Sequence, residues 1–372
     1  MRILELGKFY PPHHGGIETL LRTWCEGFIR KGAEVDCVVA NEGPRSRMET
    51  VQGVRVHRCA SFGTLMSTSA SPAYLLRCRS LPSDLWHLHF PNPLADLAAL
   101  LSLGRRKLVI SYHSDIIRQA RLTRLYSPML KWILGRADQI IVATPKHFEY
   151  SPWLAPHAAR VRCIPFGIDL ARFAPGKRDL AQISRLRSLA KGRKIILNVG
   201  RLVSYKGQRF LIEACRHLDV DLWFVGVGPL EMQLKAEAQA FGIADRTRFW
   251  GAVPDSDLPS ILHACDVFAM PSITPNEAFG LVQVEAMACG KPVVCCDLKS
   301  GVPFVNQHGI TGLVTPPSNA ESLSDALHQL LHNPDKAERM GEAGRARAHQ
   351  EFELQVMVDR YWNCFQELVR VA

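Results

Sequence analysis

Short apolar runs, separated by stretches with helical spacing, occur along this chain in two similar series. Such runs predict buried parallel strands, because a strand covered on both faces reads as a continuous apolar segment. The first series covers residues 2–6, 34–39, 85–89, 107–112 and 139–143, and the second covers 194–199, 221–225, 247–250, 266–270 and 292–295. This alternation predicts an α/β protein with two doubly wound, Rossmann-like domains facing a central cleft, where nucleotide ligands commonly bind.

The domain boundary is predicted within 165–177, because Pro175-Gly176-Lys177 combines turn-forming residues. We therefore expect an N-terminal domain over 1–172 and a C-terminal domain over 176–352. The segment 353–372 carries more apolar surface than a terminal helix needs, and we expect it to pack back on the N-terminal domain. Its apolar residues at helical spacing are Val356, Tyr361, Trp362, Phe365, Leu368 and Val369.

Composition is that of a soluble globular protein, with 47% apolar residues and a mean hydropathy of −0.02. No apolar run approaches the roughly 18 residues of a membrane-spanning helix. The first residues read as a strand interrupted by Glu5, not as a signal peptide. The 11 cysteines form no Cys-x-x-Cys pair, so we expect reduced core residues in a cytoplasmic protein without a zinc framework.

The positive charge is concentrated in the first half of the chain. Residues 1–175 contain 23 Lys and Arg against 13 Asp and Glu, whereas 176–372 contain 22 of each kind. Such a surface suits nucleic acid or an anionic membrane. The basic, amphipathic stretch 116–136 is typical of an interfacial membrane helix, with an ordinary surface helix as the alternative. No nucleic-acid-binding motif is present, so we expect a membrane partner and no nucleic acid.

The richest chemical pattern is the segment 271–290, which contains Glu277 and Glu285 with Phe279-Gly280-Leu281 between them. A loop that opens a helix here brings backbone N–H groups to an anion at the helix N-terminus. The two carboxylates can accept hydrogen bonds from hydroxyl groups. Together these features suit a nucleotide sugar, although a bare pair of glutamates is more often simply solvated.

Two further turns of the second half follow predicted strands. Arg201 and Lys206 stand at a carboxyl-terminal strand end, where α/β sheets bind ligands, and could neutralise a diphosphate. Gly226-Val-Gly228 lacks the third glycine of a dinucleotide fingerprint, and we expect it to serve helix packing against the sheet. The triplets Asp219-Val-Asp221 and Asp255-Ser-Asp257 are interpreted as a strand entry and a helix N-cap.

In the first half, Gly15 and Gly16 precede a helix, where backbone N–H groups can approach a phosphate. His113 ends a predicted strand and either faces the cleft or is a satisfied core histidine. His87 and His89 alternate on another strand, but no carboxylate cluster beside them indicates a metal site. We therefore expect no metal.

Taken in order, these motifs resemble the GT-B-fold retaining glycosyltransferases of family 4, and the resemblance covers essentially the whole chain. It also includes Pro165-Phe166-Gly-Ile-Asp169, where the family usually has Asn in place of Phe166. The resemblance implies that Arg201 and Lys206 hold the donor diphosphate and that Glu277 binds the donor sugar. It implies that Glu285 takes the ribose hydroxyls, that His113 contacts the sugar, and that Gly16 contacts the diphosphate. Backbone N–H groups of Phe279, Gly280 and Leu281 would face the phosphate and sugar.

The same resemblance implies a hexosyltransferase of cell-envelope glycan synthesis that needs no cofactor and no metal. The motifs look most like those of O-antigen or exopolysaccharide mannosyl- and rhamnosyltransferases, which favours a GDP-sugar donor and a lipid-linked or polysaccharide acceptor. A UDP-sugar donor (glucose or N-acetylglucosamine) and a GT-B-fold sugar-nucleotide epimerase remain alternatives. We expect a cytoplasmic protein held at the inner face of the plasma membrane by its basic N-terminal domain.

Overall fold

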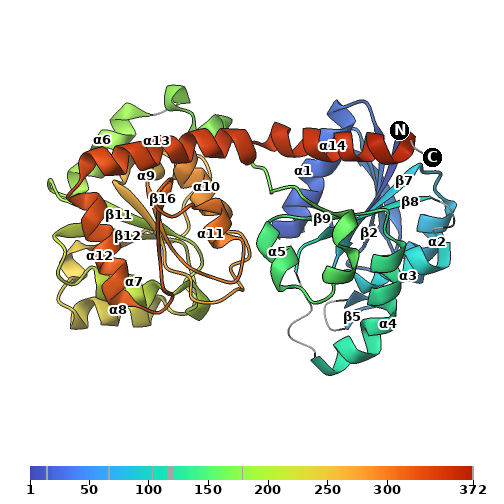
Figure 1. Ribbon diagram of the computed structural model, residues 1–372, viewed down its shortest axis with the longest axis horizontal. Coiled ribbons are helices and arrows are strands. Elements are labelled where there is room, and N and C mark those ends of the chain that lie inside the picture. Colours follow the sequence, from blue (N-terminus) through green and yellow to red (C-terminus); the bar gives the residue numbers. More distant parts are fainter. Residues whose placement is uncertain are drawn as a thin grey trace. The chain divides into compact units, whose positions relative to one another are not determined.

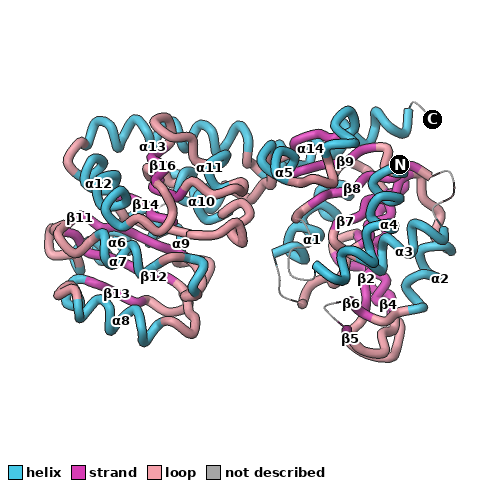
Figure 2. The backbone as a smooth tube through the Cα atoms, turned by 60° about the horizontal axis from the view of Figure 1, so that its bottom comes forward, coloured by secondary structure: helices cyan, strands magenta, loops and turns pink. Residues whose placement is uncertain are grey.

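The chain folds into two compact units, each built on one large, mainly parallel β-sheet with helices packed around it (Figure 1 and Figure 2). The computed structural model describes residues 1–13, 16–65, 68–102, 104, 106–114, 120–177 and 179–370. The first unit comprises Met1–Pro165 and Met357–Ala372, and the second comprises Phe166–Val356. Residues 166–172, expected in the N-terminal domain, thus belong to the second unit. The backbone of Ile168 bonds there to Phe352 and Leu354, at 3.0 and 2.9 Å.

The first unit contains an eight-stranded sheet in the order β10-β9-β8-β7-β1-β2-β4-β3, parallel except for the pair β3–β4. Its strands are β1 (Arg2–Leu6), β2 (Glu34–Ala40), β3 (Arg47–Val51), β4 (Val54–Cys59), β7 (Leu85–Phe90), β8 (Lys107–Tyr112), β9 (Gln139–Val142) and β10 (Val161–Cys163). A short hairpin adds β5 (Thr64–Leu65) and β6 (Thr68–Ser69). The helices are α1 (Gly16–Arg30), α2 (Pro72–Ser80), α3 (Pro93–Ser102), α4 (Ala120–Arg136) and α5 (Pro145–Tyr150), with the 3₁₀ turn η1 (Ala155–Arg160).

The five strands predicted for this half are confirmed, whereas β3, β4 and β10 of the large sheet and β5 and β6 of the small one were not predicted. Strands β3 and β10 lie at the two edges of the sheet and are largely solvent-exposed. Strand β4 interrupts its apolar residues with Arg55, His57 and Arg58. A search for continuous apolar runs therefore overlooks β3, β4 and β10, because exposed or basic residues interrupt each of them.

The second unit contains a six-stranded parallel sheet in the order β13-β12-β11-β14-β15-β16, the arrangement of the dinucleotide-binding fold. Its strands are β11 (Lys194–Val199), β12 (Val220–Val225), β13 (Thr247–Phe249), β14 (Val267–Met270), β15 (Val293–Cys296) and β16 (Gly312–Thr315). The helices are α6 (Leu180–Leu189), α7 (Gln208–Ala214), α8 (Glu231–Ala240), α9 (Leu258–Ala264), α10 (Leu281–Ala288), α11 (Val302–Val305), α12 (Ala320–Leu331) and α13 (Pro334–Glu351). The 3₁₀ turns are η2 (Ala171–Phe173), η3 (Pro175–Lys177), η4 (Ser204–Lys206) and η5 (Ala244–Arg246). The order reverses between β11 and β14, so this point is the place to look for a ligand site.

The C-terminal helix α14 (Leu354–Arg370) packs its apolar face on the first unit. The ring of Phe365 lies 5.1 Å from that of Phe28 in α1, and Lys31 pairs with Asp359 at 2.5 Å. The buried face consists of Met357, Val358, Tyr361, Cys364 and Phe365. Among the predicted apolar positions, only Tyr361 and Phe365 are fully buried, because helical periodicity alone does not locate the centre of the buried stripe.

The 11 cysteines all lie within the described residues, none of them forms a disulfide, and ten of them are buried. Cys163 was expected in the core but is exposed, because β10 is an edge strand. Among the helices that the structure describes, none combines the length and apolar character needed to cross a bilayer.

Candidate active site

Two loops meet at the point where the strand order of the second unit reverses. Strands β11 and β14 are neighbours, and their carboxyl ends lead into residues 200–207 and 271–280 respectively. The backbone N–H of Ile273 donates to the carbonyl of Tyr205 at 2.9 Å, which ties the two loops together. Because parallel strands present their carboxyl ends at one edge, the side chains of both loops gather there.

The glycines that follow β12 allow the neighbouring loop to approach closely. A Cβ atom on Gly226, whose φ is +133°, would lie 2.2 Å from the carbonyl oxygen of Gly200. A Cβ on Gly228 would lie 2.3 Å from that of Leu202. These glycines therefore serve loop-to-loop packing beside Arg201, and the expectation that they serve helix packing was wrong.

Lys206 and Glu277 form a nearly buried ion pair at this edge of the sheet. Lys206 Nζ lies 2.5 Å from Glu277 Oε2, and the two side chains are 13% and 11% exposed. The hydroxyl of Ser272 donates to the same carboxylate oxygen at 3.1 Å. Gly200 lies beside the lysine, and a Cβ there would be in van der Waals contact with Lys206 Nζ, at 3.4 Å. A cation and a carboxylate are thus held together where α/β sheets bind ligands.

Arg201 differs from Lys206 in being exposed. Its Nη2 donates to the hydroxyl of Tyr205 at 3.3 Å, and its carbonyl accepts a bond from Gln208 at 2.9 Å. The backbone of Arg201 is therefore anchored while its guanidinium faces solvent. A guanidinium in this position can bind a phosphate by two parallel hydrogen bonds.

Helix α10 begins beside the ion pair at Gly280, which adopts the left-handed conformation with φ +73°. This φ favours glycine, and a Cβ on Gly280 would also lie 2.7 Å from Met270 Cε. Leu281 is the first helical residue. Phe279 is buried and contacts Phe166 and Phe352, with ring centroids 5.1 and 5.8 Å apart. Phe166, which stands where the family usually has Asn, thus supplies an aromatic contact that helps to hold the start of α10.

Glu285 lies in the second turn of α10 and pairs with an arginine from another segment. Arg172 Nη2 lies 3.2 Å from Glu285 Oε1, and Arg172 Nη1 lies 3.9 Å from Asp255 Oδ2. Burial raises the pKa of Glu285 to about 7, although the guanidinium of Arg172 opposes this shift. The carboxyl group can therefore change its protonation state near neutral pH.

The remaining predicted site residues belong to the first unit. His113 directly follows β8, and its backbone N–H donates to the carbonyl of Phe90 at 3.1 Å. Gly16 is the first residue of α1, and its predicted contact with a phosphate stays a prediction. Gly15 lies outside the described residues, as do residues 116–119 of the basic stretch.

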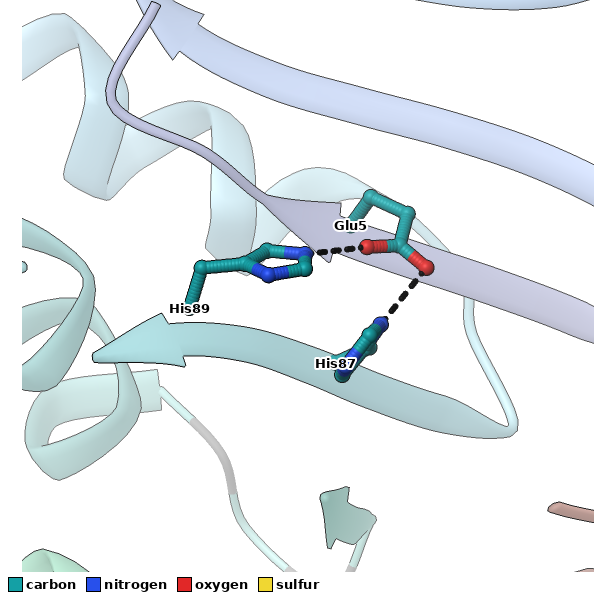
Figure 3. A group of neighbouring side chains, drawn as sticks. All are labelled: Glu5, His87 and His89. Atoms are coloured by element: carbon teal, nitrogen blue, oxygen red, sulfur yellow. Dashed lines mark hydrogen bonds and ion pairs between the residues drawn. The ribbon is translucent and has the colours of Figure 1, made fainter. Parts of the chain in front are cut away.

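A cluster of buried polar side chains lies at the reversal point of the first sheet, between β1 and β7 (Figure 3). His87 Nδ1 and His89 Nε2 each donate to one oxygen of Glu5, both at 2.9 Å. Glu5 and His87 are fully buried, and His89 is 3% exposed. No carboxylate was predicted beside these histidines, whereas the tertiary structure supplies Glu5 from the neighbouring strand.

Comparison with known proteins decides the family. Residues 14–172 match the model described as Glycosyltransferase Family 4, and residues 182–347 match Glycosyl transferases group 1. The chain is 33% identical over 355 residues to D-rhamnosyltransferase WbpZ of Pseudomonas aeruginosa, covering 95% of this chain and 92% of that protein. This chain is a family 4 glycosyltransferase. It is also 29% identical to O-antigen chain mannosyltransferase C of Escherichia coli, covering 99% of each.

Solved structures confirm the fold of this glycosyltransferase. Sucrose-phosphate synthase from Thermosynechococcus elongatus superposes with a TM-score of 0.79 at 23% identity, covering 100% of both chains. The Anabaena protein HepE, in complex with UDP, gives a TM-score of 0.77 at 22% identity, covering 99% of this chain and 100% of that one. The predicted GT-B architecture is therefore confirmed.

Two residues of the glycosyltransferase escaped the sequence analysis. Arg172 follows the Gly-Ile-Asp169 turn, and nothing in the sequence links it to Glu285, which lies far along the chain. Glu5 carried a usable signal, because a lone carboxylate inside a buried apolar strand requires a partner. Its register partner on β7 is His87.

Proposed function

We propose that this glycosyltransferase moves a hexose, of mannose or rhamnose type, from a nucleotide-diphosphate sugar to a lipid-linked or polysaccharide acceptor in cell-envelope glycan synthesis. The observation that carries the proposal is the Lys206–Glu277 pair next to the exposed Arg201 and the start of α10. A cation and a hydroxyl-binding carboxylate 2.5 Å apart suit the diphosphate and the sugar of one donor. The names of the mannosyl- and rhamnosyltransferase relatives support this choice of sugar.

In the proposed reaction, the glycosidic bond to the donor diphosphate breaks and negative charge develops on the leaving group. Lys206 and Arg201 stabilise this charge, and the backbone N–H groups at the start of α10 add their dipoles. Glu277 orients the sugar through its hydroxyl groups. Since these side chains supply the positive charge, the mechanism we propose uses no metal ion and no cofactor.

We further propose that the anomeric configuration is retained through attack on the face from which the diphosphate leaves. The acceptor hydroxyl forms the new bond and gives its proton to the departing phosphate, so atoms and charge balance. Glu277, the carboxylate in the proposed sugar site, is ion-paired with Lys206, which makes it a poor nucleophile. A covalent glycosyl-enzyme trapped on a carboxylate would contradict this route.

The donor is tested by a thermal-shift screen with GDP-mannose, GDP-rhamnose, UDP-glucose and UDP-N-acetylglucosamine. A donor at 100 times its Kd is expected to stabilise the enzyme by about 2.7 kcal/mol. We expect a shift with GDP-sugars and a smaller one with UDP-sugars. Conversion of a donor in the absence of acceptor would identify an epimerase and overturn the transferase assignment.

Donor binding is expected to strengthen as the pH rises from about 6 to about 8. The pKa of Glu285 is raised to about 7, so its carboxyl group is largely protonated below that value and accepts ribose hydrogen bonds poorly. The Kd should fall by up to about ten-fold per pH unit below the pKa and level off above it. Isothermal titration calorimetry with an intact nucleotide sugar measures this, because its diphosphate does not titrate in this range. Glu285→Gln should bind weakly at every pH, and an unchanged pH profile in that variant would exclude Glu285 as the source.

The acceptor is proposed to reach the enzyme at an anionic membrane surface, with the protein peripheral at the inner face of the plasma membrane. The support is the basic first half of the chain together with apolar side chains exposed on two packed helices. Leu100 and Leu101 of α3 are 42% and 59% exposed, and Trp132 of α4 is 37% exposed beside the exposed Lys131. Such a mixture of cations and apolar side chains suits the boundary between headgroups and acyl chains.

Binding to anionic liposomes is expected to be measurable by co-sedimentation and to weaken as salt is added. Lys131→Glu should weaken binding about five-fold or more, since each cation near such a surface contributes about 1 kcal/mol. Lys191→Glu, at an exposed position of the second unit, is the matched control and should leave binding unchanged. Equal binding to neutral vesicles at all salt concentrations would refute the membrane proposal.

A further inference from the structure

Two histidines lie next to each other at the carboxyl end of α12, in the second unit. His328 belongs to the last turn of this helix, and His332 is its C-terminal cap residue. Their rings are stacked, with centroids 3.9 Å apart and an interplanar angle of 22°. The helix buries Leu323, Leu327 and Leu330 on another face, whereas both histidines are exposed. The two imidazole rings are therefore accessible to small ligands from solution.

The spacing of the two histidines suits two ligands of one metal ion. Residues four positions apart on a helix lie on one face, and two histidines with this spacing are a known zinc-binding arrangement. Bonds from zinc to histidine nitrogen measure about 2.0–2.1 Å, so two such nitrogens on a tetrahedral ion lie roughly 3.3 Å apart. The 3.9 Å between the ring centroids is close to this span. Small rotations of the exposed side chains are therefore sufficient to bring one nitrogen of each ring to a shared ion.

The hydrogen bond of the His332 ring leaves one of its nitrogens suited to a metal. Its Nδ1 lies 3.0 Å from the backbone carbonyl oxygen of His328, and a carbonyl only accepts, so Nδ1 carries the proton. In the neutral ring the lone pair is then on Nε2. Metal-binding histidines commonly have this arrangement, in which one nitrogen donates to a carbonyl and the other binds the ion. Within the part of the chain that the structure describes, the ring of His328 makes no hydrogen bond, so it can turn toward the same ion.

The position at the end of α12 also favours a cation. The last carbonyl groups of a helix form the negative end of its dipole, so positive charge within the last turn is stabilised. The backbone N–H of His332 donates to the carbonyl of His328 at 3.0 Å. The next residue, Asn333, caps α13 by accepting a bond from the N–H of Lys336 at 3.1 Å. The backbone of His332 is thus held between two helices, and binding an ion requires no change in it.

We propose that His328 and His332 form a binding site for one Zn²⁺ ion. His332 Nε2 is one ligand, a ring nitrogen of His328 is the second, and water molecules complete the coordination. Imidazole nitrogens suit zinc and the related late transition metals, whereas Mg²⁺ and Ca²⁺ prefer oxygen ligands. The site includes none of the proposed donor residues. It therefore adds an accessory metal to the enzyme and leaves the proposed chemistry, which uses no metal, unchanged.

Isothermal titration calorimetry with zinc chloride and the untagged, chelator-treated enzyme tests the site. We expect His328→Gln and His332→Gln each to weaken Zn²⁺ binding by about 100-fold, since the second ligand of a chelate binds at a high effective concentration. The matched control is His349→Gln, which removes another exposed histidine from a helix of the same unit and should leave binding unchanged. No binding to wild type, or an equal loss in the control, would overturn the proposal. So would binding that persists in both variants, which would assign the zinc to another group, such as the buried one around Glu5.

The tautomer of His332 gives a second test, in the wild-type enzyme labelled with ¹⁵N-histidine. Two-bond ¹H–¹⁵N correlation spectra at about pH 8, where an exposed histidine is largely neutral, show which ring nitrogen carries the proton. The signal of His332 is assigned by its loss in His332→Gln. We expect the Nδ1–H pattern without metal and a shift of the Nε2 signal when Zn²⁺ is added. An Nε2–H pattern, or an Nε2 signal that zinc leaves unchanged, would overturn the proposal. Neither measurement depends on catalysis, so the result stands apart from the test of the proposed function.

Discussion

Lys206→Met is expected to lower kcat/KM for the nucleotide-sugar donor by about 10³-fold, the upper range for removing one preorganised charge at a reacting centre. Lys206 Nζ lies 2.5 Å from Glu277 Oε2 at the point where the second sheet reverses its strand order. Methionine retains the length of the side chain but removes the charge that opposes the leaving diphosphate. Steady-state kinetics measures the effect, with circular dichroism to establish that the variant folds.

The matched control for this variant is Lys235→Met. Lys235 also pairs with a glutamate, Glu231, at 2.7 Å, but on the exposed surface of α8 in the same unit. We expect its activity to remain within about two-fold of wild type, since exposed pairs contribute little. The double variant Lys206→Met, Glu277→Gln separates two roles of Lys206. If Lys206 only neutralised Glu277, the double variant would recover activity, and that recovery would contradict its role toward the diphosphate.

Acid is expected to destabilise the first unit strongly between about pH 6.5 and pH 4. Burial and His87 lower the folded-state pKa of His89 from 6.5 to about 4. Between these values the unfolded chain binds more protons than the folded one, so the free energy of unfolding falls as the pH falls. For His89 alone the loss amounts to roughly 3 kcal/mol, and the lowered pKa of His113 adds in the same direction. Below about pH 4.5 the ionised Glu5, whose pKa is about 2, contributes a further loss.

Urea titrations followed by tryptophan fluorescence at a series of pH values measure this stability. His89→Gln keeps an N–H donor for Glu5 but cannot titrate. The number of protons taken up on unfolding should therefore be smaller by up to one in this variant, and its free energy of unfolding should depend less steeply on pH. Its stability at neutral pH should also fall, because the stacking contact with Trp24 is lost. An identical pH dependence in wild type and His89→Gln would assign the acid sensitivity to other groups.

The donor-site interpretation depended on motifs that are local in sequence. The apolar strands preceding Arg201, Lys206 and Glu277 were recognisable because parallel strands are buried on both faces, and their carboxyl ends point to one edge. Only the tertiary structure pairs Lys206 with Glu277, and it shows that Arg201 is exposed whereas this pair is nearly buried. Sequence spacing cannot predict such pairings, because they depend on the order of strands in the sheet.

By itself, the sequence determined the two-fold repetition of the βα plan, the glycosyltransferase family and the loops that carry the candidate donor residues. These properties depend on short contiguous segments, and each segment can be recognised from its own hydrophobic pattern or motif. The tertiary structure alone decided that Arg172 faces Glu285, that Gly226 and Gly228 pack on the Arg201 loop, and that Glu5 joins His87 and His89. Each of these contacts links segments that are separate in the chain, and each depends on how the fold brings strands, loops and helices together.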